Sequence, residues 1–588
     1  MGESDEHHDR KHHSDSDEDP HKNQHQKGPQ IKDAASEDAD LGIDLSRLKK
    51  IDWRWALIIV FLIVGWSWRS YHMDFPSIGY HNMKENEYLS QALNQYNHGD
   101  YLRRQMHILG LDDGPGYFEE YPQMPIIPWM IELSWRVFGI HFWSARVIMI
   151  LFSLGSVVMI YLLAQRLTKS DYISLLSAFL MAYLPLNIFF GRNIQPESPA
   201  LFFMLLASVL YLRWLDDMSV KNSIWLGLAI ALTGIFKYTF LIIMIPWLGF
   251  FPYRALLKKD FWLTTSRPLL ALLAGLSPLL LWTALAPLLN TKQAVFEATF
   301  SRVNLWRIFT PDYWNQFSDI MRSYITDNYT MWFVWFFIIG IILVLFKYRT
   351  KLGRFLLLYV LAIIPYAMVL ADFIKGHNYY QMPFLPLVIL ASAYALYVMG
   401  KFLAQGSRWK LAIFIPLILI PLSHAQVQAS LDRQYGVIFY GLDVAADYIH
   451  ANSNTSERFW VATFNPQSYG VCFLADRRCA GLVNNETQFM HGEDDLNFSW
   501  LYIHIQGQGM PSVMQNPDIF QYVQDNYRLV QIGLLQSGQG TIPVHLVLQK
   551  GGTSNLTDFM QNPIASHAGK QATVYDTPKG QVPFYVVE

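Results

Sequence analysis

The stretch RLKKIDWRWALIIVFLIVGW, residues 47–66, decides the fold class. Basic residues precede an apolar run that begins near Ala56, after a long polar tail, so we expect no cleavable signal peptide. Similar runs of about 17 to 25 residues recur along the chain, and this length crosses a bilayer. The sequence therefore predicts a polytopic α-helical membrane protein with about eleven transmembrane helices. The candidate spans are 55–72, 142–164, 171–190, 198–215, 222–237, 239–253, 267–289, 331–347, 353–372, 382–400 and 409–424.

The composition combines polar and apolar regions. The 588 residues are 52% hydrophobic and 16% charged, against about 25% charged in ordinary globular proteins. The formal net charge of −2 lacks the excess of basic residues that is typical of nucleic-acid-binding proteins. Residues 1–50 are predicted to form a disordered, His-rich tail, because they contain almost no apolar side chains that could form a core. Metal binding by these histidines is an alternative to a solvated tail.

Basic residues alternate along the chain in a way that predicts its orientation. If the N-terminus is cytoplasmic, five further basic loops all fall on the cytoplasmic side, as the positive-inside rule requires. These loops carry Arg166 and Lys169; Arg213 and Lys221; Arg254, Lys258, Lys259 and Arg267; Lys347, Arg349, Lys351 and Arg354; and Lys401, Arg408 and Lys410. The orientation leaves a large outer loop at 73–141 and places everything after 424 outside.

Residues 425–588 predict a separate extracytoplasmic α/β domain, following a transmembrane domain at 51–424. Short apolar runs of strand length, such as Phe459 to Thr463, alternate with helix-like segments such as Leu442 to Ala451. Cys472 and Cys479, the two cysteines of the chain, lie on the expected oxidising side. A disulfide between them is the favoured prediction, and two free buried thiols are the alternative.

Polar clusters at the outer ends of the predicted helices are the candidate site, because polar groups are costly to hold near a membrane and usually mark function there. Glu85 opens an amphipathic helix in the first outer loop, where it is a candidate general base. The alternative is a solvated glutamate in a helix's first turn. Further clusters surround Glu120, Arg192 to Glu197, Lys237 and His377 to Pro383. Each alone could be a capping or snorkelling group.

These motifs, in this order over residues 55–400, resemble the GT-C glycosyltransferases. The closest branch contains protein O-mannosyltransferases and the lipid A aminoarabinose transferase. The family's first-loop Asp-Glu motif corresponds to Lys84-Glu85, ahead of Tyr88, and its Glu-Phe-Pro-Leu-Tyr-Pro pattern resembles 120–125. Its Arg-x-x-x-Pro-Asp/Glu pattern resembles 192–197, and its His-x-Tyr-Tyr-x-x-Pro pattern resembles 377–383. Lys84 stands where the family has its catalytic aspartate, so the resemblance leaves Glu85 as the expected base.

The resemblance implies inverting sugar transfer from a polyprenyl-phosphate donor to an acceptor outside the membrane. The acceptor is a lipid, a glycan or a protein, and the sequence specifies neither it nor the sugar. Cations that pair with the lipid phosphate make a metal unnecessary, although a divalent metal is compatible with the sequence. The expected catalytic carboxylates are Glu85, Glu120 and Glu197. The expected phosphate ligands are Lys237, Arg192, His377 and Arg302, and the expected substrate-binding residues are Lys84, Tyr88, Tyr379 and Tyr380.

Two other function classes compete with a glycosyltransferase. A secondary transporter would place ionisable groups near the bilayer midplane, often in two repeated halves. This chain has few charges within its spans and no detectable repeat. A membrane-anchored extracytoplasmic binding protein would need far fewer helices. The position of the polar clusters at outer helix ends therefore favours the enzyme.

Overall fold

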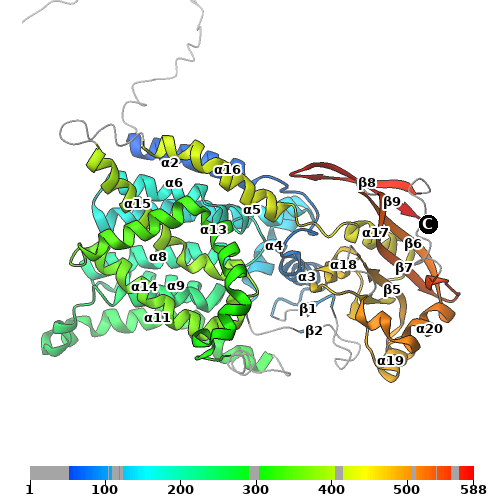
Figure 1. Cartoon of the computed structure of the whole chain (residues 1–588). Helices are drawn as coiled ribbons and strands as arrows, with labels where there is room; N and C mark the ends of the chain where they lie inside the picture. Colours follow the sequence, from blue (N-terminus) through cyan, green and yellow to red (C-terminus); the bar gives the residue numbers. More distant parts are fainter. Residues whose placement is uncertain are drawn as a thin grey trace, which may run out of the picture. The chain divides into compact units, whose positions relative to one another are not determined.

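Figure 1 shows the computed structural model of the chain. It describes residues 52–102, 105–108, 118–119, 123–289, 303–403, 415–505, 511–537, 540–557 and 569–588. The predicted disordered tail at 1–50 lies outside these residues. The described part consists of long apolar helices followed by an α/β domain, as predicted.

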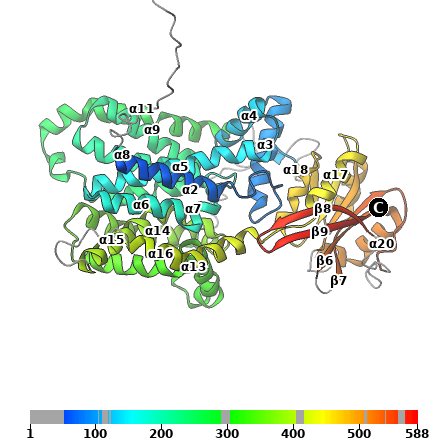
Figure 2. The ribbon, with the colours of Figure 1, turned by 90° about the horizontal axis from the view of Figure 1, so that it is seen from above.

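The helical part begins with α2 (Trp53–Arg69), which packs against α5 (Phe142–Thr168) and α6 (Asp171–Tyr183), as Figure 2 shows from above. Its other elements are α7 (Pro185–Phe189), α8 (Glu197–Asp216), α9 (Val220–Lys237), η2 (Tyr238–Ile243), α10 (Met244–Trp247), η3 (Tyr253–Leu257), α11 (Lys259–Leu289), η4 (Arg307–Phe309), α13 (Pro311–Leu345), α14 (Lys351–Ile374), η5 (Asn378–Phe384), α15 (Leu385–Leu403) and α16 (Ile415–Tyr435).

Among the described residues, seven segments are long and apolar enough to cross a membrane. They are Phe142–Thr168, Glu197–Asp216, Val220–Trp247, Lys259–Ala286, Pro311–Leu345, Lys351–Ile374 and Asn378–Leu403. The other predicted spans correspond to α2, to the pair α6 and α7, and to α16, so the number of about eleven stays a prediction. The chain is a polytopic membrane protein.

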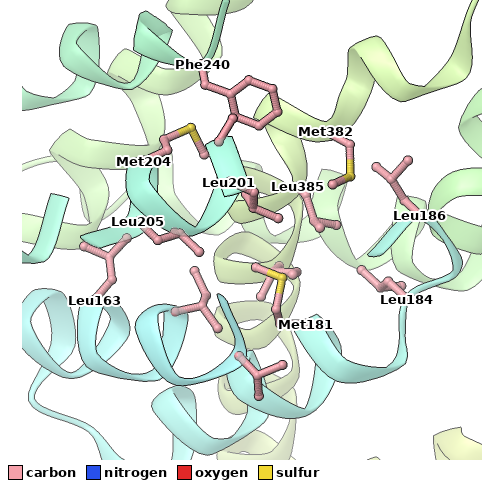
Figure 3. Packing of buried hydrophobic residues seen from close by; sticks show 14 of the residues in the cluster. Leu163, Met181, Leu184, Leu186, Leu201, Met204, Leu205, Phe240, Met382 and Leu385 are labelled. Atoms are coloured by element: carbon pink, nitrogen blue, oxygen red, sulfur yellow. The ribbon is translucent and has the colours of Figure 1, made fainter. Parts of the chain in front are cut away.

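The membrane helices share one apolar core. Figure 3 shows Leu163 of α5 and Met181 of α6 facing Leu201, Met204 and Leu205 of α8. All five side chains are fully buried, and their close packing fixes how these helices lie against one another. The helix ends that carry the polar clusters are therefore held by a rigid scaffold.

The chain reverses direction at Lys237, where the sequence predicted a break between two short spans. The backbone of Lys237 is extended (φ −160°, ψ 107°), which ends α9. The side chain of Lys237 meets Glu197 at the start of α8. Ten residues later, the carbonyl of Trp247 accepts a 3.0 Å hydrogen bond from the hydroxyl of Tyr211, near the other end of α8. η2 and α10 thus run back along α8.

The first outer loop contains two helices, α3 (Asn82–His98) and α4 (Ile126–Phe138), and a two-stranded ladder of β1 (Gln105–Met106) and β2 (Phe118–Glu119). The first of these helices matches the amphipathic helix expected at Glu85. α3 packs on α4 and β1, and it also contacts α18 and η7 of the C-terminal domain. α3 therefore lies between the membrane helices and that domain.

The C-terminal domain is built on a seven-stranded sheet of order β4-β3-β5-β7-β6-β9-β8. β3 pairs in parallel with β4 and β5, and the remaining pairs are antiparallel. The strands are β3 (Arg458–Ala462), β4 (Cys479–Gly481), β5 (Phe498–His504), β6 (Tyr527–Ser537), β7 (Gly540–Lys550), β8 (Lys570–Thr577) and β9 (Gly580–Val587). The other elements are α17 (Leu442–Asn452), η7 (Pro466–Tyr469), α18 (Gly470–Leu474), α19 (Glu486–Leu496), η8 (Ser512–Gln515) and α20 (Pro517–Asn526). α16 continues past the expected boundary at 424 and ends at Tyr435, so the α/β fold starts about a dozen residues later than the hydropathy pattern suggested.

A disulfide joins Cys472 of α18 to Cys479 at the start of β4. The amide of Cys479 donates a 2.9 Å hydrogen bond to the carbonyl of His107 in the first outer loop. The disulfide thus closes the segment of the C-terminal domain that contacts the first loop.

Candidate functional site

Three helix ends bring Lys237, Glu197 and two tyrosines together. Lys237 is the last residue of α9, and Glu197 is the first residue of α8. The ammonium of Lys237 pairs with Oε1 of Glu197. It also lies 4.6 Å from the ring centroid of Tyr379 and 4.6 Å from that of Tyr380, both in η5. Cation–π contacts of this kind favour an ammonium that is partly removed from water.

Glu197 has an unused hydrogen-bond acceptor. Its carboxylate is almost completely buried, and within the described part of the chain Oε2 has no hydrogen-bond partner. An unsatisfied buried acceptor is costly unless a ligand supplies a donor. The arrangement thus offers a cation and a hydrogen-bond acceptor at one place.

Two histidines lie beside this cluster. The ring centroids of His81 and His377 are 5.3 Å apart, and Nε2 of His81 lies 3.3 Å from Oδ1 of Asn378. Burial, with the positive charges of Lys237 and Lys84 nearby, lowers the pKa of His377 to about 4. Burial, with His377 and Lys237 nearby, lowers the pKa of His81 to about 3. Both rings are therefore neutral at pH 7. His377 is a hydrogen-bonding group there and not the cation that the sequence suggested.

The start of α3 lies against the same cluster. The hydroxyl of Tyr88 donates a 3.0 Å hydrogen bond to Oε1 of Gln123. Nε2 of Gln123 in turn donates a 2.6 Å bond to the carbonyl of Phe236, the residue before Lys237. One turn before Tyr88, the ammonium of Lys84 lies 2.6 Å from Oε2 of Glu87. The predicted residues Lys84, Tyr88, Lys237, Tyr379 and Tyr380 thus belong to one region.

The carboxylate of Glu85 binds a different set of residues, and both of its oxygens accept hydrogen bonds from them. Its carboxylate accepts hydrogen bonds from the Ser77 hydroxyl (2.9 Å) and the Ile194 amide (3.1 Å), and it pairs with Nη2 of Arg146 (2.8 Å). Burial acts to raise the pKa of Glu85, but Arg146 and the other donors outweigh it and lower the pKa to about 2. A carboxylate held in this way is a poor proton acceptor. In this structure Glu85 joins α3 to α5 through a buried ion pair, and its role as catalytic base stays a prediction.

Arg192 belongs to the Glu85 cluster. Its guanidinium donates to the carbonyl of Tyr71 and lies 5.3 Å from the ring centroid of Tyr435. Arg146, Arg192 and Glu85 line one hollow with Tyr435. Of the expected phosphate ligands, Lys237 and His377 therefore lie together, while Arg192 lies elsewhere.

Glu120 and Arg302 lie outside the described residues. In the described ranges, no group of three or more His, Cys, Asp or Glu side chains is placed to hold a metal ion.

Sequence reasoning missed Arg146 and Glu87. Arg146 had a signal, because it is a lone cation in the first turn of the long apolar run at 142–164. Glu87 had a weaker one, because it follows Lys84 by three residues and so lies on the same side of a helix.

Comparisons with known proteins agree with the motif resemblance. Residues 121–282 match the family described as dolichyl-phosphate-mannose-protein mannosyltransferase. An uncharacterised protein of Aquifex aeolicus is 25% identical over 389 residues, which cover 59% of this chain and 70% of that protein. The provisionally named mannosyltransferase YycA of Bacillus subtilis is 29% identical over 126 residues, which cover 21% of this chain and 17% of that protein.

Solved structures identify the fold. The oligosaccharyltransferase of Archaeoglobus fulgidus, tethered to an acceptor peptide, superimposes with a TM-score of 0.53 at 12% identity, over 86% of this chain and 75% of that one. The same enzyme in complex with an inhibitory peptide and a dolichol-phosphate gives a TM-score of 0.50 at 12% identity, over 84% and 74%. The chain has the GT-C glycosyltransferase fold. The superposition covers 86% of the chain, so it extends beyond residues 55–400, to which the motif resemblance was limited.

Proposed function

We propose that this chain is a membrane glycosyltransferase that moves a sugar from a polyprenyl-phosphate donor to an acceptor hydroxyl, with inversion. The proposal rests on the ion pair between Lys237 and Glu197, whose ammonium also contacts the rings of Tyr379 and Tyr380. A sugar phosphate needs a cation for its phosphate and hydrogen-bond acceptors for its hydroxyls. Lys237 supplies the first, and Oε2 of Glu197 supplies the second.

The neighbouring groups suit this ligand. The neutral His377 donates a hydrogen bond to the phosphate in the proposed complex, and the phosphate's negative charge would favour its protonation. Lys84, with Lys237, gives the region a second ammonium. The structure of the Archaeoglobus enzyme of the same fold was solved in complex with a dolichol-phosphate, which supports a lipid phosphate as the donor's carrier here.

The reaction is proposed to take place on the extracytoplasmic side, with the N-terminus in the cytoplasm. The five basic loops support this orientation, because they fall at the opposite helix ends from the site. Lipid, glycan and protein acceptors all remain compatible with the site.

We also propose that the reaction needs no divalent metal. The lipid phosphate leaves as an anion, and Lys237 can stabilise its charge directly. Turnover after treatment with EDTA should equal untreated turnover, and loss of activity that Mg²⁺ or Mn²⁺ restores would contradict this part of the proposal.

A pair of lysine variants tests the donor site. Lys375 is a matched control, because its ammonium lies 3.0 Å from Asp372 and 4.6 Å from the Phe317 ring centroid, the same contact types that Lys237 has. Full-length protein in lipid nanodiscs is titrated with undecaprenyl phosphate while its melting temperature is measured. Lys237→Met should abolish the stabilisation and Lys375→Met should keep it. Equal stabilisation of both variants would exclude Lys237 from the phosphate site.

A further inference from the structure

The two tyrosines beside Lys237 belong to η5, a short 3₁₀ segment that contains one proline and is followed closely by another. In a 3₁₀ helix the amide of each residue donates to the carbonyl three residues earlier. Pro383 has no amide hydrogen, so the carbonyl of Tyr380 lacks this donor. Pro386, the second residue of α15, deprives the carbonyl of Pro383 in the same way. Two carbonyls of this segment therefore need another donor within the membrane protein.

Two tyrosine hydroxyls of α14 supply these donors. The hydroxyl of Tyr366 donates a 2.7 Å hydrogen bond to the carbonyl of Tyr380. The hydroxyl of Tyr359 donates to the carbonyl of Pro383. Both side chains are buried, and they lie about two helical turns apart on one side of α14. Each hydroxyl thus binds the carbonyl that a proline leaves without its usual donor.

α13 binds the remaining part of η5. Nδ2 of Asn328 donates a 3.1 Å hydrogen bond to the carbonyl of Asn378, and Nδ2 of Asn378 donates a 3.3 Å bond to Oδ1 of Asn328. The hydroxyl of Tyr329 donates a 2.9 Å bond to the carbonyl of Gln381. Side chains of two helices therefore hold the backbone of η5 along its length.

The backbone of η5 determines where its aromatic rings lie. The ammonium of Lys237 is 4.6 Å from the ring centroids of both Tyr379 and Tyr380. The ring of His377 stacks on that of Tyr379, with 5.1 Å between the centroids. Tyr366 binds the carbonyl of Tyr380 itself, so loss of this bond would let the rings shift relative to Lys237.

We propose that Tyr366 and Tyr359 are positioning residues of the donor site. Their hydroxyls replace the hydrogen bonds that Pro383 and Pro386 remove, and they hold η5 so that its rings face the donor phosphate. The prolines make the segment depend on these hydroxyls, because a residue with an amide hydrogen would satisfy the same carbonyls. The inference rests on the proposed function, in which Lys237 binds the phosphate.

The test removes one hydroxyl and then restores one amide hydrogen. Tyr366→Phe deletes the donor to the carbonyl of Tyr380, and Pro383→Ala gives the same carbonyl an amide donor. Both variants and their combination are made in full-length protein in lipid nanodiscs. The measured quantity is the undecaprenyl phosphate concentration that gives half of the maximal rise in melting temperature.

Tyr313→Phe is the matched control. The buried hydroxyl of Tyr313 donates a 2.9 Å hydrogen bond to the carbonyl of Ala371 and so joins the same two helices, α13 and α14, without binding η5. Tyr359→Phe is a second variant, which removes the other hydroxyl that binds η5.

Tyr366→Phe should raise the half-maximal concentration about tenfold, because a buried carbonyl loses its donor. Tyr359→Phe should raise it as well. Tyr313→Phe should lower the melting temperature of the ligand-free protein and leave the concentration within about twofold of wild type. In the Pro383→Ala background, Tyr366→Phe should change the concentration by less than about threefold, since the new amide replaces the hydroxyl.

A half-maximal concentration that either tyrosine variant leaves unchanged would overturn the positioning role of that tyrosine. A loss of equal size with and without Pro383→Ala would overturn the link between the hydroxyl and the proline. In both cases the proposed function stands if wild-type protein is stabilised by undecaprenyl phosphate and transfers the sugar. Wild-type protein that undecaprenyl phosphate does not stabilise would overturn the proposed donor site, and this inference with it.

Discussion

Nη2 of Arg146 lies 2.8 Å from Oε2 of Glu85, and both side chains are buried. This ion pair joins the first turn of α5 to the first turn of α3, 61 residues earlier. It therefore positions the helix that carries Lys84 and Glu87.

We expect Glu85→Gln to act on stability. Removing one charge of a buried pair leaves the other uncompensated, and this typically costs about 3–5 kcal/mol. The melting temperature of the purified protein should fall markedly, while turnover per folded molecule should change far less than the melting temperature implies for the whole sample. A stable Glu85→Gln protein without activity would support Glu85 as the base.

The same pair predicts a pH dependence. The pKa of Glu85 is about 2 in the folded protein and 4.5 for an ordinary glutamate. Because the folded pKa is the lower one, the stabilisation is complete above pH 4.5 and is lost as the pH falls toward 2. Melting curves between pH 5 and pH 3 should show a loss in wild type that is smaller in Glu85→Gln. Parallel curves for the two proteins would contradict the assignment.

The disulfide should support the contact between the first loop and the C-terminal domain. Cys472→Ser should lower stability by about 2 kcal/mol, as expected for a short closed loop, and should reduce turnover more than donor binding. Mass spectrometry of protein from its native membrane should find the two cysteines joined. Two thiols alkylated without prior reduction would show that the disulfide is absent.

The orientation of the chain is a separate prediction. Reporter fusions at residues 260 and 405 should read cytoplasmic, and a fusion at 580 should read extracytoplasmic. A cytoplasmic signal at 580 would mean that the number of spans is wrong by one.

The sequence predicted helix positions well because hydropathy is a local property. It also predicted an anionic partner for Lys237, namely the donor phosphate. It did not predict that Glu197, 40 residues earlier, pairs with Lys237, because the reversal at Lys237 is a consequence of packing.

The partner of Glu85 was not predicted, for the same reason. Local spacing placed Glu85 on the amphipathic helix correctly, but its partner Arg146 lies on another helix. Spacing within a motif predicts which side chains share one face of a helix. It does not predict which residues, distant in the sequence, neutralise the charges of those side chains. The pair between Arg146 and Glu85 was therefore missed, although Glu85 itself matched the family pattern.

The most direct test of the central claim is release of the lipid phosphate. Purified full-length protein is incubated with a panel of polyprenyl-phosphate sugars and a membrane extract as the source of acceptor, and free polyprenyl phosphate is quantified. At least one donor should be consumed, its sugar should appear in the extract with inverted configuration, and Lys237→Met should abolish both. Absence of release from every donor, by protein that still binds undecaprenyl phosphate, would contradict the central claim.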